Sequence, residues 1–136
     1  MEARGVWKGG FETELSDGRG HVVTVDLPRS EGGHDWGPSA LELGVLSLAG
    51  CITTIFCLVA KKRKLSFRRL SVHLTADRPT RAPTVQRVHG TVEVGSDAPK
   101  EEVETTLALT LKTCPMGVLF EQAHVPIEVT LSVVPP

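Results

Sequence analysis

The sequence lacks an excess of charge of either sign. Its 136 residues carry 15 lysines and arginines against 16 aspartates and glutamates, a formal net charge of −1. Chains that bind nucleic acid or an anionic membrane surface by electrostatics usually carry a marked basic excess. We therefore expect neither nucleic acid nor a membrane among its partners.

The chain is also poor in cysteine and has no apolar leader. Three cysteines are present, and the first ten residues, MEARGVWKGG, contain no hydrophobic signal region. An odd number of cysteines without a secretion signal favours a reducing compartment, and reactive or inert thiols over a disulfide framework. We therefore expect a cytoplasmic protein.

Several common cofactor motifs are missing. There is no Cys-x-x-Cys pair and no Gly-x-Gly-x-x-Gly, which argues against a zinc ribbon, a thioredoxin-like motif and a dinucleotide site. The best metal candidates, His34 and Asp35 with a cysteine, lack ligand spacing. We expect no metal and no cofactor.

What the sequence does contain is one long apolar segment, Ser39–Lys64. It opens with the Ser-x-x-Glu spacing of a capping box, Ser39 and Glu42, and closes with four cations at 61–64. No side chain from Leu43 to Ala60 is charged. The pattern predicts a helix of about 26 residues that is apolar all round and hence buried on every side.

Either a bilayer or a protein interior could bury such a helix. The uncharged run is at the lower edge of a membrane span. Glycine, serine and threonine dilute it, however, and segments with strand character lie on both sides of it. These features favour a protein interior. Because 136 residues cannot easily surround so long a helix, we expect a second subunit to cover part of it.

Helical periodicity assigns the cysteines of this segment to different faces. Cys51 lies on a face of small residues, which comprises Ala40, Gly44, Ser47, Cys51 and Thr54. Cys57 lies about 120° away, and we predict it to be in the core. Cys51 is the reactive group of its face, although an inert buried thiol is the simpler interpretation of one cysteine alone.

The remaining elements predict an α+β fold in a single domain over residues 1–136. Alternating apolar residues indicate strands, and capping signals indicate two more helices. The expected strands are 3–8, 11–15, 21–26, 70–76, 88–94 and 125–133, and the expected helices are 97–112 and 116–123.

Cys114 stands where the last helix begins. We predict Thr113 as the N-cap and Pro115 in the first turn, so that the helix N-terminus lowers the thiol pKa of Cys114. With Cys51 it could form a peroxidatic and resolving pair, in which a thiolate becomes a sulfenic acid and the second thiol converts it to a disulfide. Ordinary packing at a helix start is the alternative.

Three stretches together resemble the OsmC/Ohr family of osmotically inducible and organic-hydroperoxide-resistance proteins. They are GPSALELGVLSLAGC, RRLSVHLTADRP and CPMGVLFEQAHVPIEVTLSV, and the likeness runs from about Trp7 to Val133. The resemblance implies antiparallel sheets around long central helices in an intertwined homodimer. It also implies reduction of organic hydroperoxides and re-reduction by thiols, with Cys51 peroxidatic and Cys114 resolving.

The sequence departs from the peroxidases of that family at the activating pair. They carry a glutamate ten residues before the first cysteine, paired with an arginine from the N-terminal region. Here that position is Leu41, and Glu42 lies nine residues before, on the opposite side of a continuous helix. Glu42 could act only through the partner subunit or a helix break; its alternative role is the capping box.

Arg19 is the nearest candidate for the arginine, ahead of Arg4. The pattern is similar to a divergent OsmC-like branch. The alternative function is a non-catalytic homodimer that binds a small apolar or thiol-bearing ligand in the cleft over Cys51.

Overall fold

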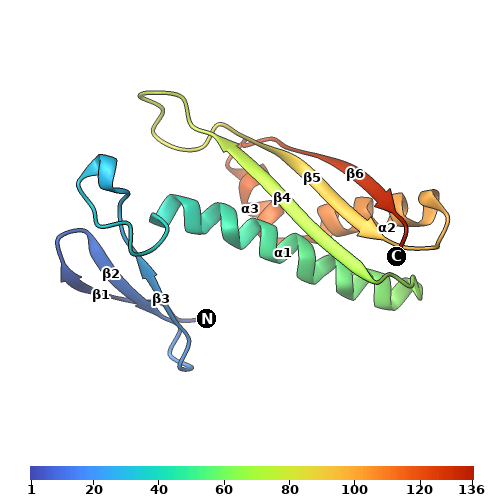
Figure 1. Ribbon diagram of the computed structural model, residues 1–136, viewed down its shortest axis with the longest axis horizontal. Coiled ribbons are helices and arrows are strands. Elements are labelled where there is room, and N and C mark those ends of the chain that lie inside the picture. The colour runs from blue at the N-terminus through green and yellow to red at the C-terminus, as the bar shows by residue number, and fades with distance from the viewer. The chain divides into compact units, whose positions relative to one another are not determined.

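The computed structural model describes all residues from 1 to 136, and their contacts divide the chain into two compact units, Met1–Gly44 and Val45–Pro136 (Figure 1). The long helix α1, Ala40–Arg63, begins in the first unit and continues into the second. The mixture of helices and two sheets confirms the α+β class. The single domain stays a prediction.

The first unit contains an antiparallel meander. Strands β1 (Arg4–Gly9), β2 (Glu12–Ser16) and β3 (Val22–Val25) pair in that order, within two residues of the predicted bounds. Gly9 and Gly10 form the first turn with φ values of 133° and 52°, which glycine adopts without steric cost. The predicted strand ranges therefore located both hairpins correctly.

Asp26 organises the loop that leads from this sheet to α1. Its buried carboxylate accepts backbone N–H bonds from Leu27, His34 and Trp36 at 2.8, 2.9 and 3.4 Å. Burial raises the pKa of Asp26, but the three donors outweigh it and the net shift is downward. The loop, with the 3₁₀ helix η1 at Arg29–Glu31, is therefore held by one carboxylate that the sequence analysis did not single out.

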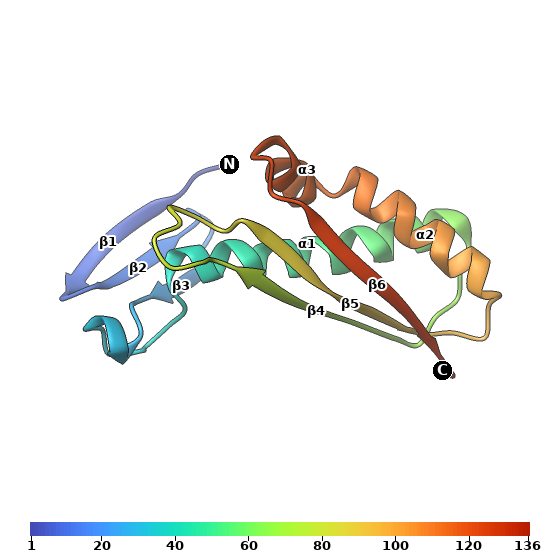
Figure 2. The same cartoon turned by 90° about the horizontal axis from the view of Figure 1, so that it is seen from above.

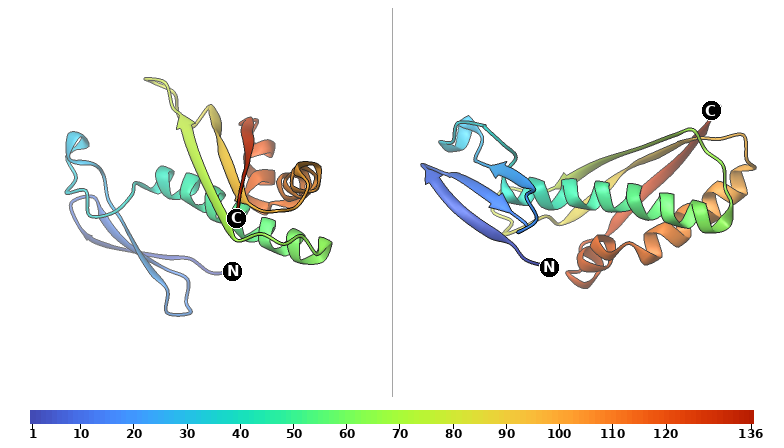
Figure 3. Two further views of the ribbon diagram at one scale, coloured as in Figure 1. Left: turned by 45° about the vertical axis from the view of Figure 1, so that its right-hand side comes forward. Right: turned by 90° about the horizontal axis from the view of Figure 1, so that it is seen from below.

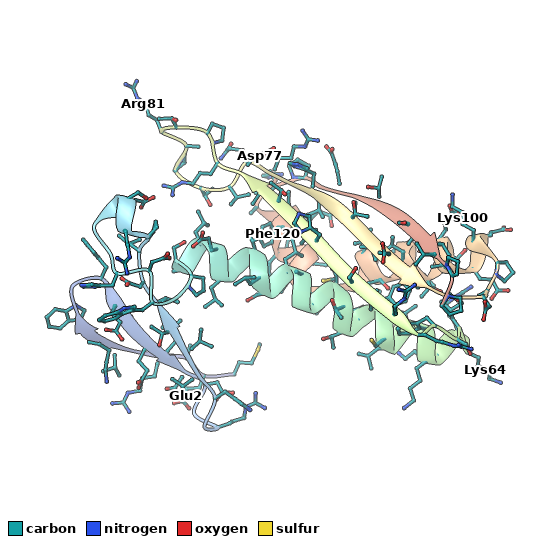
Figure 4. All side chains as sticks on the ribbon, viewed as in Figure 1. Glu2, Lys64, Asp77, Arg81, Lys100 and Phe120 are labelled. Carbon is teal, nitrogen blue, oxygen red and sulfur yellow. The ribbon has the colours of Figure 1, made fainter.

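The capping box at the start of α1 is confirmed. The Ser39 N–H donates to the Glu42 carboxylate at 2.7 Å, and the Glu42 N–H donates to Ser39 Oγ at 3.3 Å. These bonds with Ser39 lower the pKa of Glu42. At the other end α1 stops at Arg63, and Lys64 takes a left-handed φ of 59° (Figure 4).

We expect Glu42→Ala to lower the free energy of unfolding by about 0.5–1 kcal/mol at neutral pH, because one half of the box is lost. The lowered pKa makes this contribution present above the ordinary glutamate pKa and lost as pH falls through the folded-state value. Urea unfolding at neutral pH and at about pH 3 measures it. Glu42→Gln, which keeps a hydrogen-bond acceptor, is the control. If Glu42→Ala lowers the free energy of unfolding equally at both pH values, the capping role of the Glu42 carboxylate is contradicted.

The second unit holds a mixed sheet, which corrects the prediction of antiparallel sheets. Strands β4 (Arg69–Asp77) and β5 (Arg87–Gly95) are antiparallel, but β6 (Ile127–Val134) runs parallel to β5. Helices α2 (Lys100–Thr113) and α3 (Pro115–Gln122) lie between β5 and β6 in the chain. They return the chain to the end where β5 began, as a parallel crossover requires.

The core of this unit lies between the sheet and the helices. Figures 2 and 3 show α2, α3 and the α1 residues from 45 onward on one face of the sheet. Fully buried residues form a stripe along α1 and along one side of β5; they are Leu48, Ile52, Phe56, Ala60, Val88, Val92 and Val94. Along β4 exposed side chains alternate with half-buried ones, which agrees with the alternation from which the strand was predicted. Arg63 Nε donates to Thr106 Oγ1 at 3.1 Å and joins α1 to α2.

The prediction that α1 is buried on every side is wrong within one chain. Only one stripe of the helix is buried, and Leu46, Cys57 and Leu58 are exposed, so Cys57 is not in the core of its own chain. A single sheet and two helices can cover only one face. The helix is also long and apolar enough to cross a membrane. Within its most apolar stretch of 18 residues, 22% is buried inside the protein. Core helices pass the same test, so this is weak evidence for a membrane span.

Candidate active site

Cys51 lies in the middle of α1, immediately before the buried Ile52. The helix register that buries Ile52 against the core turns Cys51 to the edge of the buried stripe. Its side chain is accordingly half-buried rather than enclosed. Cys51 can thus contact both the second unit's core and small molecules from solvent.

Cys114 occupies the junction between α2 and α3 and is fully buried. Cys114 itself is the N-cap of α3, which corrects the prediction of Thr113. Its backbone is extended, Pro115 occupies the first turn, and its Sγ accepts the Gly117 N–H at 3.4 Å. Proline suits this position because a first-turn N–H has no intrahelical partner. The local sequence Cys-Pro-x-Gly therefore places a sulfur at a helix start.

The fold brings the two sulfurs together within one chain. Cys114 Sγ donates to Cys51 Sγ across 2.9 Å, and both are free thiols. The residues are 63 positions apart, so only the tertiary fold creates this contact. Two thiols at this distance can be joined by a bond after a small adjustment.

The expected lowering of the Cys114 pKa is wrong. Burial, followed by the hydrogen bond to Cys51, raises the pKa of Cys114 to about 11, and this outweighs the N–H of Gly117. A fully buried thiolate would lose its solvation, and one backbone donor does not replace it. Cys114 therefore keeps its proton at neutral pH and offers it to the Cys51 sulfur.

Arg19 and Glu42 both belong to the first unit. Arg19 makes an exposed ion pair with Asp17 at 2.9 Å. Hydrogen bonds from His21 and from Arg19 lower the pKa of Asp17 to about 2. Glu42 serves in the capping box. Their roles toward Cys51 stay predictions.

Two of the histidines outside the first sheet contact other side chains. His34 stacks on Trp36 with ring centroids 4.5 Å apart, and His89 Nδ1 lies 3.5 Å from Asp77. At no point do three His, Cys, Asp or Glu side chains gather as possible metal ligands.

A cavity of about 520 Å³ lies beside Cys114 in the second unit. Its wall is nearly as polar as it is apolar, and one lysine and one glutamate contribute to it; the lining residues are Leu48, Ile52, Leu111, Lys112, Cys114, Gly117, Glu121, Val125, Pro126 and Ile127. The sequence analysis missed Gly117 and Lys112, although both lie within three residues of Cys114. The cavity gives the cysteine pair an open space on its Cys114 side.

Comparison with known proteins shows which family the chain belongs to. The family model described as OsmC-like protein matches residues 32–130, which is more than half of the chain and includes Cys51 and Cys114. The chain belongs to the OsmC-like family. No curated protein matches the sequence.

Solved structures agree with the OsmC-like fold. An OsmC-like protein from Mycoplasma pneumoniae is similar with a TM-score of 0.87 at 17% identity, over 98% of this chain and 96% of the other. An organic hydroperoxide resistance protein from Legionella pneumophila has a TM-score of 0.69 at 21% identity, over 96% and 95%. One from Elizabethkingia anophelis, with crystallant-derived thiocyanate bound, has 0.73 at 19%, over 98% and 94%. At these identities the likeness shows the fold.

Proposed function

We propose that this OsmC-like protein is a thiol-dependent peroxidase that reduces organic hydroperoxides with Cys51 and Cys114. The observation that carries the proposal is the 2.9 Å approach of the two sulfurs. Names of similar proteins in the family, which include organic hydroperoxide resistance proteins, support the substrate class.

The first step uses the Cys51 thiolate. It attacks the outer oxygen of the hydroperoxide, the O–O bond breaks, and the alcohol leaves with a proton from solvent while Cys51 becomes a sulfenic acid. Cys51 suits this role because it is half-exposed, whereas Cys114 is fully buried and holds its proton. The hydrogen bond donated by Cys114 stabilises a charged sulfur on Cys51.

The second step closes the disulfide. The Cys114 sulfur attacks the sulfenic sulfur, and hydroxide leaves as water with the Cys114 proton. The peroxide has then gained two electrons from the two thiols. Because the sulfurs already touch, this step requires little rearrangement.

Activation of Cys51 needs a cation, since a cysteine in mid-helix gains little from the helix dipole. In the second unit the hydrogen bond to the Cys51 sulfur comes from Cys114 and not from a lysine or arginine. We propose Arg19 as the activator and Glu42 as its partner. Arg19 would then exchange Asp17, its present partner, for the active site.

We also propose the homodimer and the cytoplasmic location. The dimer is supported by the exposed apolar residues of α1, Leu46 and Leu58, which lie on the helix that carries Cys51. A second copy packed there would cover the face that one chain leaves open.

A steady-state assay with cumene hydroperoxide and dithiothreitol tests the function. We expect turnover, and mass spectrometry after one equivalent of peroxide should show loss of two hydrogens and a Cys51–Cys114 bond. Cys57→Ser, which removes an exposed thiol outside the pair, is the matched control and should behave as the wild type. The proposal would be wrong if the protein showed no turnover, or if peroxide oxidised it without forming the Cys51–Cys114 bond.

The second candidate is a non-catalytic protein that binds a small apolar or thiol-bearing ligand. The cavity of about 520 Å³ beside Cys114 favours it, because aliphatic side chains of Leu48, Ile52 and Leu111 line part of its wall. This candidate predicts that a small apolar thiol binds the reduced protein, measured by calorimetry, and that cumene hydroperoxide is not consumed. Consumption of hydroperoxide through Cys51 decides for the enzyme.

A further inference from the structure

The second unit has another cavity, of about 370 Å³, which shares no lining residue with the cavity beside Cys114. One wall is the segment 64–68 between α1 and β4, and the other is the segment 96–98 with Glu102 from the first turn of α2. Figures 1 and 2 show the end of α1, the start of β4 and the start of α2 at the same end of this unit. We propose that this cavity binds a short peptide as a zwitterion, with the peptide carboxylate at the first wall and its ammonium group at the second.

Hydrogen bonds hold the two walls of this cavity together. Ser96 Oγ donates to the Ser66 carbonyl at 2.6 Å, and the Arg68 N–H donates to the Gly95 carbonyl at 2.8 Å. Ser96 and Leu65 are buried, with 7% and 8% of their surfaces exposed. The cavity is therefore formed before any ligand arrives, and no loop has to become ordered when one binds.

The two walls carry opposite charges. The first wall presents the cations of Lys64 and Arg68, and the second presents the carboxylates of Asp97 and Glu102. None of these four side chains forms an ion pair or a hydrogen bond within the protein. A ligand with both a carboxylate and an ammonium group can bind both walls at once, whereas a simple anion or cation is repelled by one of them.

The separation of the walls favours a peptide over a free amino acid. Both charges of an amino acid are attached to one carbon, but those of a dipeptide are separated by roughly 7 Å, at about 3.5 Å per residue. Opposite charges that do not pair across the cavity fit the longer ligand better. Leu65 and Phe67 also line the cavity and provide apolar surface for a side chain. Leucyl-leucine is therefore a suitable probe.

The backbone of Lys64 supports a role for its side chain. Helix α1 ends in a Schellman motif, in which the Lys64 N–H donates to the Lys61 carbonyl at 3.3 Å and the Leu65 N–H donates to the Ala60 carbonyl at 2.9 Å. Lys64 has the left-handed φ of 59° that this motif requires and that glycine adopts without strain. Backbone strain of this kind is found at ligand sites, and the proposed site gives the Lys64 ammonium group a function there.

Lys64→Gly separates binding from stability. Glycine relieves the left-handed φ, so we expect the variant to unfold at the same urea concentration as the wild type or a higher one. The dissociation constant for leucyl-leucine, measured by calorimetry, should rise about tenfold because a charge-assisted hydrogen bond is lost. Lys62→Ala, which removes a cation that does not line the cavity, should bind as the wild type does. Unchanged binding in Lys64→Gly, or equal weakening in both variants, would overturn the proposal.

Blocked peptides test the two walls separately. N-acetyl-leucyl-leucine lacks the ammonium group and leucyl-leucine amide lacks the carboxylate, and we expect each to bind the wild type about tenfold more weakly than the free peptide. Blocked peptides that bind as tightly as leucyl-leucine, or a free peptide that shows no saturable binding, would refute the zwitterion site. These measurements use reduced protein without peroxide, so their outcome does not depend on peroxidase activity.

Discussion

Cys51→Ser is expected to lower hydroperoxide turnover to the rate of the reductant alone. The attacking group is a thiolate, and a serine hydroxyl at the same position is not ionised at neutral pH and cannot form a sulfenic acid. Cys114 cannot take over, because it is fully buried with a pKa raised to about 11. Peroxide consumption coupled to dithiothreitol oxidation measures the effect; turnover that survives in this variant would refute the assignment of Cys51.

The companion variant Cys114→Ser separates the two steps. Serine is a strong N-cap, so α3 keeps its start while the second thiol is removed. We expect one equivalent of peroxide to add one oxygen to Cys51, which dimedone traps, and no disulfide to form. Rapid disulfide formation in Cys114→Ser would show that another thiol, such as the exposed Cys57, resolves the intermediate.

Phe56→Ala is expected to lower the free energy of unfolding by about 3–5 kcal/mol. Phe56 is fully buried in the α1 stripe and packs edge-on against Phe67, with ring centroids 5.5 Å apart. Its truncation leaves a cavity that the sheet and helices cannot close. Urea unfolding measures the loss, and the free energy must be compared at one protein concentration if the protein dimerises.

Leu119→Ala is the matched control for Phe56→Ala. Leu119 is 57% exposed on α3, and its truncation should change the free energy of unfolding by less than about 0.5 kcal/mol. Equal losses in the two variants would contradict the placement of the core along Leu48, Ile52 and Phe56.

Local features of this protein were predictable from the sequence. The capping box of Ser39 and Glu42 and the glycine turn at Gly9-Gly10 depend on residues within a few positions of one another. The alternation along β4 reflects one exposed and one half-buried face. Such patterns also located the helix junction at Cys114, although the cap proved to be the cysteine and not Thr113.

Features that depend on distant contacts were mispredicted or could not be predicted. The direction of β6 depends on the path of α2 and α3, and alternation is the same in parallel and antiparallel strands. A helix start indicates a lowered thiol pKa, but the burial of Cys114 outweighs it. The apolar helix α1 was expected to be buried all round, yet one chain covers only one stripe, so Cys57 is exposed.

The sequence by itself determined the elements, the α+β class and the identity of two candidate thiols, because hydrophobic period, caps and turns act over short distances along the chain. The tertiary structure alone decided that these thiols meet at 2.9 Å, that Cys114 is the buried and protonated one, and that a cavity lies on its side. These properties arise from packing between segments more than sixty residues apart, and solvation in such a contact is a property of the assembled core.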